Sequence, residues 1–162
     1  MTNNVDQIQL VVTVNGEKFL RMIEPRLSLV DFLRNELELT GSHVGCEHGV
    51  CGACTVIVDG VIVRGCLMLA IQTSGGEVVT IEGQSDSGKI SDLQKAFHER
   101  NALQCGFCTP GMLLTSTELL QKNPDPSREE IREYLSGNYC RCTGYEAIVD
   151  AVETVAATRR GA

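Results

Sequence analysis

Eight cysteines are the residues of this 162-residue chain whose spacing points most directly to chemistry. The first four follow the pattern C-x4-C-x2-C with a fourth cysteine further along: Cys46, Cys51, Cys54 and Cys66. Plant-type [2Fe-2S] clusters are held by cysteines with this spacing. The loop also contains small residues that let backbone N–H groups approach sulfur: Gly45, Gly49, Gly52 and Ala53. We therefore predict that these four cysteines bind one [2Fe-2S] cluster.

Two alternatives exist for this first group. Cys51 and Cys54 alone form a C-x2-C pair that would also suit a zinc site. The x4 spacing and the glycine-rich loop together favour the two-iron cluster. His48 lies inside the loop and is a candidate ligand of a Rieske-type centre, in which histidines replace two of the cysteines. Because four thiols are present, we expect His48 to be a solvated loop residue.

The second group combines a C-x2-C pair, Cys105 and Cys108, with a C-x-C pair, Cys140 and Cys142. The first pair directly precedes a predicted helix, and the second pair lies between two further predicted helices. Helix N-termini stabilise negative charge, and a thiolate-bound cluster is net negative. Taken alone, this set fits zinc as well as iron. Considered together with the first group, this set predicts a second [2Fe-2S] cluster.

The elements around the first group are strands in two hairpins. Residues 8–14 pair with 17–23, and residues 55–58 pair with 61–63. Each pair is joined by a two-residue turn of the kind that favours type I′ hairpins, Asn15-Gly16 and Asp59-Gly60.

One helix and one further strand complete this half. Ser28, followed three residues later by Asp31, resembles a capping box and starts a short helix that should end near residues 38–41. Residues 78–81 supply a late strand. Two hairpins, a helix and a late strand predict a small mixed sheet that grips one helix, which is a β-grasp arrangement.

After residue 82 the strand signals disappear. Residues 83–89 (GQSDSGK) form a polar connector rich in glycine and serine. We therefore predict two domains, over residues 1–82 and 83–162, and a fold of the α+β class.

Four helices are predicted in the second domain. Apolar stripes mark the first and the last of them: Leu93, Ala96 and Phe97, then Ile148, Val149, Val152 and Val155. Thr109 before Pro110 predicts the N-cap and first position of the second helix. Ser127 with Glu130 forms a capping box for the third, and the fourth follows Gly144.

Charge and composition exclude several classes of function. The formal net charge is −7, which disfavours phosphate backbones and anionic membranes, so we expect no nucleic-acid partner. The start MTNNVDQIQL lacks the features of an export signal, and no apolar run reaches the length of a membrane span. Cysteines in a reducing compartment more often bind metal than form structural disulfides. We expect a cytoplasmic protein.

Four strings carry a family resemblance. They are GCEHGVCGACTV at residues 45–56, CLMLA at 66–70, QCGFCTPG at 104–111 and NYCRCTGY at 138–145. In this order they closely resemble the iron-sulfur small subunit of the xanthine oxidase family of molybdenum hydroxylases. The resemblance extends from the first hairpin to the last helix, which is essentially the whole chain.

This resemblance implies a β-grasp ferredoxin-like [2Fe-2S] domain followed by a four-helix-bundle [2Fe-2S] domain. It implies that the helical cluster lies next to molybdopterin on a large subunit, and that Gln104 and Cys142 contact the pterin. The other cluster would pass electrons toward FAD on a medium subunit. The implied function is electron transfer within a molybdenum-dependent hydroxylase or dehydrogenase complex, without substrate chemistry on this chain.

Several alternatives stay open at this point. A free-standing ferredoxin-like carrier and a zinc-stabilised binding module are the rival functions. Without the family, Gln104 would be an ordinary surface or capping residue, and we expect Phe107 to pack in the core around its cluster. Carbon monoxide, an aldehyde and an aromatic N-heterocycle all remain open as substrates of the complex, because the substrate pocket belongs to another subunit.

Overall fold

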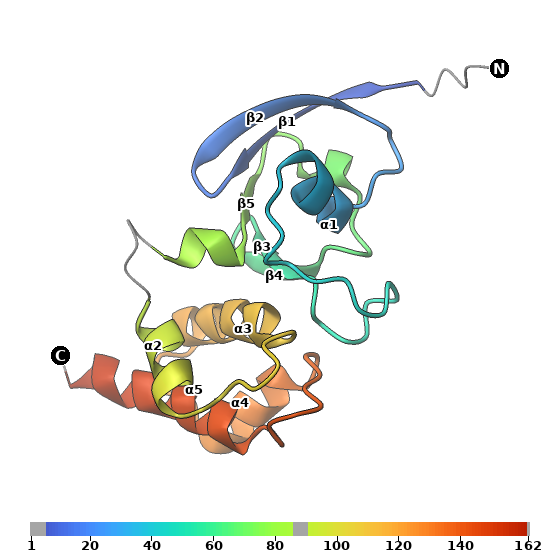
Figure 1. Cartoon of the computed structure of the whole chain (residues 1–162). Coiled ribbons are helices and arrows are strands. Elements are labelled where there is room, and N and C mark those ends of the chain that lie inside the picture. The colour runs from blue at the N-terminus through green and yellow to red at the C-terminus, as the bar shows by residue number, and fades with distance from the viewer. Residues whose placement is uncertain (1–5, 86–90, 162) are drawn as a thin grey trace.

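The computed structural model describes residues 6–85 and 91–161. Within them the chain has two parts, which Figure 1 shows one above the other. The upper part is a five-stranded sheet with a short helix against it, and the lower part consists of four longer helices. The fold is thus α+β, with a β-grasp domain followed by a helical domain, as predicted.

The sheet is built from two hairpins and a strand that joins them. The strands are β1 Ile8–Val14, β2 Glu17–Ile23, β3 Thr55–Val58, β4 Val61–Arg64 and β5 Glu77–Val79, in the order β2-β1-β5-β3-β4. β1 and β5 pair in parallel, and the other neighbours pair antiparallel. Asn15, Gly16, Asp59 and Gly60 have φ of 51°, 82°, 48° and 81°, as the predicted type I′ turns require.

One face of the sheet packs against the segment that follows Ser28. Ser28 Oγ accepts the N–H of Asp31 at 3.1 Å, so the predicted cap is confirmed. Helix α1, Leu29–Asp31, continues as a wider π-helical turn over Phe32–Glu36, which ends before the predicted 38–41. Strand and helix side chains meet in one core: Leu10, Val12, Val14, Ile23, Leu29, Phe32, Leu33, Val56, Val58, Ala70 and Val78.

The predicted end of the late strand is wrong. A strand over residues 78–81 is expected, but β5 ends two residues earlier and a 3-10 helix, η3, covers Ile81–Gln84. The Thr80 N–H donates to Asn15 Oδ1 at 2.9 Å, and the first residue of η3 packs against the core of the helical part. Those two contacts draw the chain out of the sheet. Because η3 crosses residue 82, the boundary drawn there stays a prediction.

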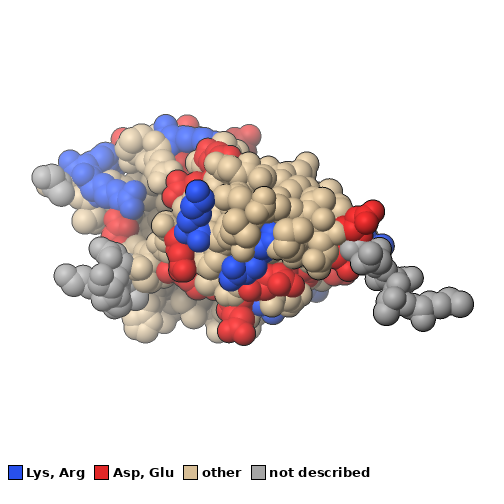
Figure 2. Space-filling model, turned by 90° about the horizontal axis from the view of Figure 1, so that it is seen from above, with Lys and Arg blue, Asp and Glu red and all other residues tan. Residues whose placement is uncertain are grey.

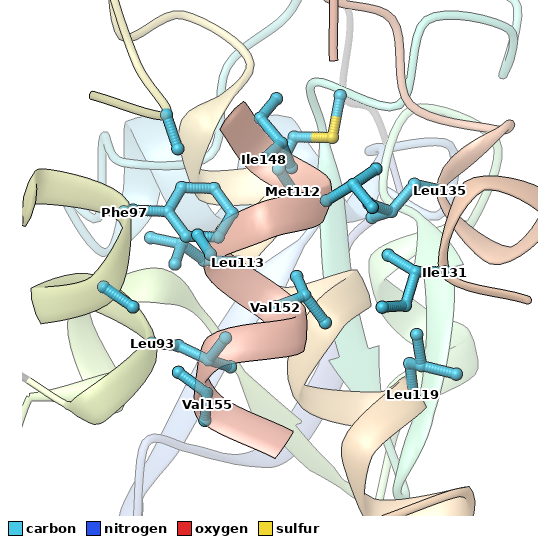
Figure 3. Close-up of a cluster of buried hydrophobic side chains, with 14 of the residues drawn as sticks. Leu93, Phe97, Met112, Leu113, Leu119, Ile131, Leu135, Ile148, Val152 and Val155 are labelled. Carbon is cyan, nitrogen blue, oxygen red and sulfur yellow. The ribbon is translucent and has the colours of Figure 1, made fainter. Parts of the chain in front are cut away.

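Four helices form the second part. They are α2 Asp92–Glu99, α3 Thr109–Lys122, α4 Arg128–Leu135 and α5 Glu146–Arg160. Ser127 and Glu130 form the predicted capping box at α4. Apolar side chains from all four helices meet in one core, where Phe97, Met112 and Ile148 are completely buried (Figure 3). This core is separate from the core under the sheet.

Helix α3 begins one residue before its predicted first position. Thr109 is expected as the N-cap, but Cys108 occupies that position, with φ −85° and ψ −14° already in the right-handed helical region. Pro110 lies in the first turn, where its missing N–H forfeits no helical bond. Thr109 is therefore not a cap. Its Oγ1 atom is buried and has no hydrogen-bond partner among the described residues.

Helix α3 also joins the two domains, since it packs on β3 and β4. Glu118 lies in this contact with 1% of its side chain exposed. Its carboxylate accepts from the Ile62 N–H at 3.1 Å, the Tyr134 hydroxyl at 2.5 Å and the Lys122 ammonium at 2.7 Å. Burial acts to raise the pKa of Glu118, but Lys122, Tyr134 and the Ile62 N–H outweigh it and lower the pKa from its ordinary 4.5. One carboxylate thus holds groups from both domains.

The variant Glu118→Gln is expected to weaken the contact between the domains. Loss of a charged acceptor costs about 1.5 to 3 kcal/mol of folding free energy. Because the folded-state pKa is lowered, the Glu118 carboxylate stabilises the fold at pH values above its unfolded pKa. That stabilisation is lost as the pH falls through the folded value. Thermal denaturation should give a lower Tm for the variant at pH 7 and a smaller further loss of Tm between about pH 5 and pH 3.

Glu129→Gln, on the exposed side of α4, is the matched control and should leave both quantities unchanged. If the parent and Glu118→Gln lose the same Tm on acidification, the acid-sensitive group lies elsewhere.

Charged side chains of both signs are interspersed on the face that Figure 2 shows from above. An uncharged area lies between them in the same view. Over residues 6–85 and 91–161, no helix combines the length and apolar character that a membrane crossing needs.

Candidate iron-sulfur sites

Cys46 and Cys51 belong to the glycine-rich loop that precedes β3. Cys46 Sγ accepts the backbone N–H groups of Cys51 and His48, each at 3.4 Å. These donors, with that of Cys51 the stronger, lower the pKa of Cys46 to about 6. The same donors would stabilise a sulfur bound to iron. The His48 residue is exposed, as expected, and it reaches the Cys46 sulfur through its main chain.

Cys54 and Cys66 flank the hairpin β3–β4, and the hairpin brings them together. The Gly65 N–H donates to the Cys54 carbonyl at 3.1 Å. Burial raises the pKa of Cys54 to about 11, and the nearby thiols of Cys66 and Cys51 act in the same direction. The bond from Gly65 to Cys54 and the bond from Cys51 to Cys46 thus bring the ends of this hairpin and the preceding loop into one region.

Two glycines leave the space that this loop needs. A Cβ on Gly45 would lie 3.1 Å from Cys51 Sγ. A Cβ on Gly52 would lie 2.5 Å from the Gly137 carbonyl oxygen, and Gly52 has a φ of +73°, which favours glycine. This site thus offers four thiols, N–H donors that point to sulfur, and glycines that let the backbone approach closely. These features fit a cluster that the loop encloses.

The second group lies where α3 begins. Cys105 and Cys142 are exposed, with their Sγ atoms 3.6 Å apart. Cys108 and Cys140 are half-buried. Burial raises the pKa of Cys108 to about 12, with the thiols of Cys140 and Cys105 adding to the shift. Cys108 is the N-cap of α3, where the positive end of the helix dipole favours negative charge.

Within the described residues, no three His, Cys, Asp or Glu side chains surround one point closely enough for a single metal ion. Thiols of each group lie near one another instead: the Sγ atoms of Cys105 and Cys142 are 3.6 Å apart, and Cys46 Sγ accepts the N–H of Cys51. In a [2Fe-2S] cluster each iron takes two protein thiolates and shares two sulfides. Four thiols at each site therefore fit a two-iron cluster.

Thr143 supplies two donors to Cys140. Its Oγ1 lies 3.1 Å from Cys140 Sγ, and its N–H lies 3.4 Å from the same sulfur. Burial acts to raise the pKa of Cys140, but the Thr143 hydroxyl and N–H and the Cys142 N–H outweigh it and lower the pKa. Sequence reasoning missed Thr143, although its position directly after the C-x-C pair was a usable signal.

The two cysteine groups are joined by hydrogen bonds between their loops. The Tyr139 N–H, next to Cys140, donates to the Cys51 carbonyl at 2.8 Å. The Asn138 side chain, 1% exposed, donates through Nδ2 to the Gly52 carbonyl at 3.1 Å. The ligand loop of the first group therefore contacts the C-x-C segment of the second group directly.

Phe107 does not pack in a core, so that expectation is wrong. Its side chain is 46% exposed, and its ring stacks on the His43 ring with centroids 4.7 Å apart. His43 Nδ1–H donates to the Phe107 carbonyl at 2.8 Å. Phe107 therefore links the Cys105–Cys108 loop to the segment before Cys46, which no periodicity in the sequence indicates.

Gln104 lies beside Cys142, the other residue expected at the pterin. Gln104 Nε2 donates to the Cys142 carbonyl at 2.9 Å, and both residues are exposed. The pair thus forms one polar surface next to the second cysteine group.

Comparison with known proteins agrees with these two sites. The family described as "2Fe-2S iron-sulfur cluster binding domain" matches residues 12–74, and the family described as "[2Fe-2S] binding domain" matches residues 80–153. The nicotine 6-hydroxylase small subunit of Paenarthrobacter nicotinovorans is 54% identical over 147 residues, 91% of this chain and 88% of that protein. The xanthine dehydrogenase iron-sulfur-binding subunit of Escherichia coli O157:H7 is 43% identical over 152 residues, 93% and 95% of the two chains. The chain belongs to the iron-sulfur small subunits of the xanthine oxidase family of molybdenum hydroxylases.

A solved member of this family has the same fold. The crystal structure of quinoline 2-oxidoreductase from Pseudomonas putida 86 contains a chain with a TM-score of 0.92 and 50% identity, and the match covers 96% of this chain and 98% of that one. As a member of the family, the chain carries two [2Fe-2S] clusters, one in each domain, and it is an electron-transfer component of an oxidoreductase complex. The assignment of single cysteines to each cluster stays a prediction.

Proposed function

We propose that this chain carries electrons from molybdopterin on a large subunit, through its helical domain and then its β-grasp domain, toward FAD on a medium subunit. The bond from the Tyr139 N–H to the Cys51 carbonyl supports this most, because it joins the loops of both sites. Bound [2Fe-2S] clusters supply one-electron redox chemistry. The residues of the chain hold the two centres close together and surround them with N–H donors.

The ligand assignment is part of this proposal. The first cluster would take Cys46, Cys51, Cys54 and Cys66, and the second would take Cys105, Cys108, Cys140 and Cys142. The 3.6 Å distance between the Sγ atoms of Cys105 and Cys142 supports it, as does the position of Cys108 at the N-terminus of α3.

The direction of transfer rests on exposure. Cys105 and Cys142 are exposed and Gln104 lies beside them, so a large subunit that covers this surface reaches the second site directly. We assign Gln104 and Cys142 to the pterin contact. In the first group Cys54 is buried and the other three are half-buried. The medium subunit would then approach the side of the first loop.

Gln104→Ala is expected to slow the reduction of the second cluster by substrate roughly two- to tenfold, the equivalent of one neutral hydrogen bond. The iron content should stay unchanged, because glutamine is not a ligand. Rapid-freeze EPR of the complex after mixing with substrate measures the rate and shows which cluster is reduced first. Gln121→Ala, an exposed glutamine near the other end of α3, is the control. First reduction of the Cys46 group would show that the electron path runs the other way.

Two further points belong to this proposal. Relatives are named for nicotine, caffeine, nicotinate and xanthine, which are all N-heterocycles, so we propose an N-heterocycle as substrate of the complex. Cysteines that hold clusters and form no disulfides suit a reducing compartment, and we place the complex in the cytoplasm.

A further inference from the structure

Three hydrogen bonds close a ring around Cys140. The Cys140 N–H donates to the Tyr145 hydroxyl at 2.9 Å, and the Tyr145 N–H donates to Thr143 Oγ1 at 3.2 Å. Thr143 Oγ1 in turn lies 3.1 Å from Cys140 Sγ. The ring starts at the main chain of Cys140 and ends at its sulfur.

The direction of each bond in this ring is determined by chemistry. A backbone N–H can only donate, so Thr143 Oγ1 accepts from Tyr145 with a lone pair. The single hydroxyl proton of Thr143 is then available to Cys140 Sγ. Tyr145 has a φ of +70°, a left-handed conformation that is unfavourable for a tyrosine. The bonds on either side of Tyr145 hold the backbone in that conformation.

We propose that Thr143 tunes the second cluster, because its hydroxyl donates to Cys140 Sγ and raises the reduction potential of that cluster. This inference rests on the proposed ligation by Cys140. A cluster becomes more negative when it takes up an electron, and donors to its sulfurs stabilise the reduced form more than the oxidised form. Thr143 is a positioning and tuning residue.

A side-chain donor sets this site apart from Cys46, whose two donors belong to the backbone. A hydroxyl can be removed by one substitution without any change to the main chain. The potential of the second cluster can therefore be altered separately from that of the first.

The test is an EPR-monitored redox titration of the complete complex with dithionite as reductant. Thr143→Val keeps the shape of the side chain and removes the hydroxyl. It is expected to change the ratio of reduced to oxidised second cluster about five- to tenfold at a fixed potential, a shift of about 40 to 60 mV to lower potential for one electron. Thr143→Ser, which retains the hydroxyl, should have the same second-cluster reduction potential as the parent. The first cluster is the internal reference and should not move.

Thr158→Val, which removes an exposed hydroxyl bonded within α5, is the control for a general effect of the substitution. An unchanged second potential in Thr143→Val, or an equal shift of both clusters, overturns the inference. If the valine variant assembles no second cluster, Thr143→Ala replaces it. If the valine and alanine variants both lack the second cluster while Thr143→Ser retains it, the role of Thr143 is purely structural and the tuning proposal is overturned. Absence of two-iron signals from the parent complex would count against the proposed function instead.

Discussion

Replacing Cys51 with serine is expected to lower the iron content from about four to about two atoms per chain, with an equal loss of acid-labile sulfide. Cys51 belongs to the first group alone, and soft thiolates select iron-sulfur clusters where a hydroxyl does not. One of two reduced-cluster EPR signals should therefore disappear and the other remain. The bond from Tyr139 to residue 51 uses the main-chain carbonyl, so the second site keeps its support.

Cys105→Ser is the matched variant in the second group, and it should remove the opposite signal. Loss of both signals in a folded Cys51→Ser protein would mean that ligands are shared between the domains. Stoichiometric zinc without sulfide in the parent chain would refute the cluster assignment altogether.

Gly52→Ala is expected to damage both the first site and the contact between the domains. The new Cβ would lie 2.5 Å from the Gly137 carbonyl oxygen, a backbone atom, and 2.7 Å from Asn138 Nδ2. The positive φ of Gly52 adds about 1 to 2 kcal/mol for any residue with a Cβ. The loop that carries Cys51 and Cys54 must therefore shift. Thermal denaturation and the EPR signal of the first cluster measure the two effects.

Gly60→Ala separates these causes. Gly60 has a φ of +81°, and no atom of residues 6–85 or 91–161 lies within 4 Å of its Cβ position, so this variant incurs the backbone strain without the clash. Its Tm should fall by about 2 to 8 °C with the first cluster intact. Gly52→Ala should lose at least twice as much Tm and most of the first-cluster signal. Equal losses in the two variants would show that the approach of Gly137 to this loop is unimportant.

The local elements could be predicted from the sequence because their signals are local. Alternating apolar residues and Asn15-Gly16 predict the first hairpin to the residue. Ser28 and Ser127 each predict a helix start that the structure confirms. The cysteine spacing likewise indicates which thiols belong together, because a short loop has few ways to wrap a cluster.

The contacts between the domains could not be predicted in this way. The position of Phe107 depends on the ring of His43, which lies in the other domain. The early end of β5 depends on Asn15 and on a second core that η3 joins. The burial of Glu118 depends on the sheet that packs against α3, where the Ile62 N–H donates to its carboxylate. Each of these outcomes is decided by a partner that is distant in sequence, so no local pattern carries it.

The bonds that Asn138 and Tyr139 make to the first loop have a consequence for how the protein can be divided. A chain severed between the domains would, on one side, remove the Tyr139 donor from the Cys51 carbonyl and the Asn138 donor from the Gly52 carbonyl. On the other side, the amide of Asn138, buried in the intact chain, would face solvent. The two cores are distinct, yet each half has polar groups whose hydrogen-bond partners lie in the other half. A hybrid made of halves from two relatives would therefore need glycine at residue 52 and asparagine at residue 138, because the Asn138 side chain makes its bond where the loop approaches closely. The main-chain groups of residues 51 and 139 are present whichever residues stand there.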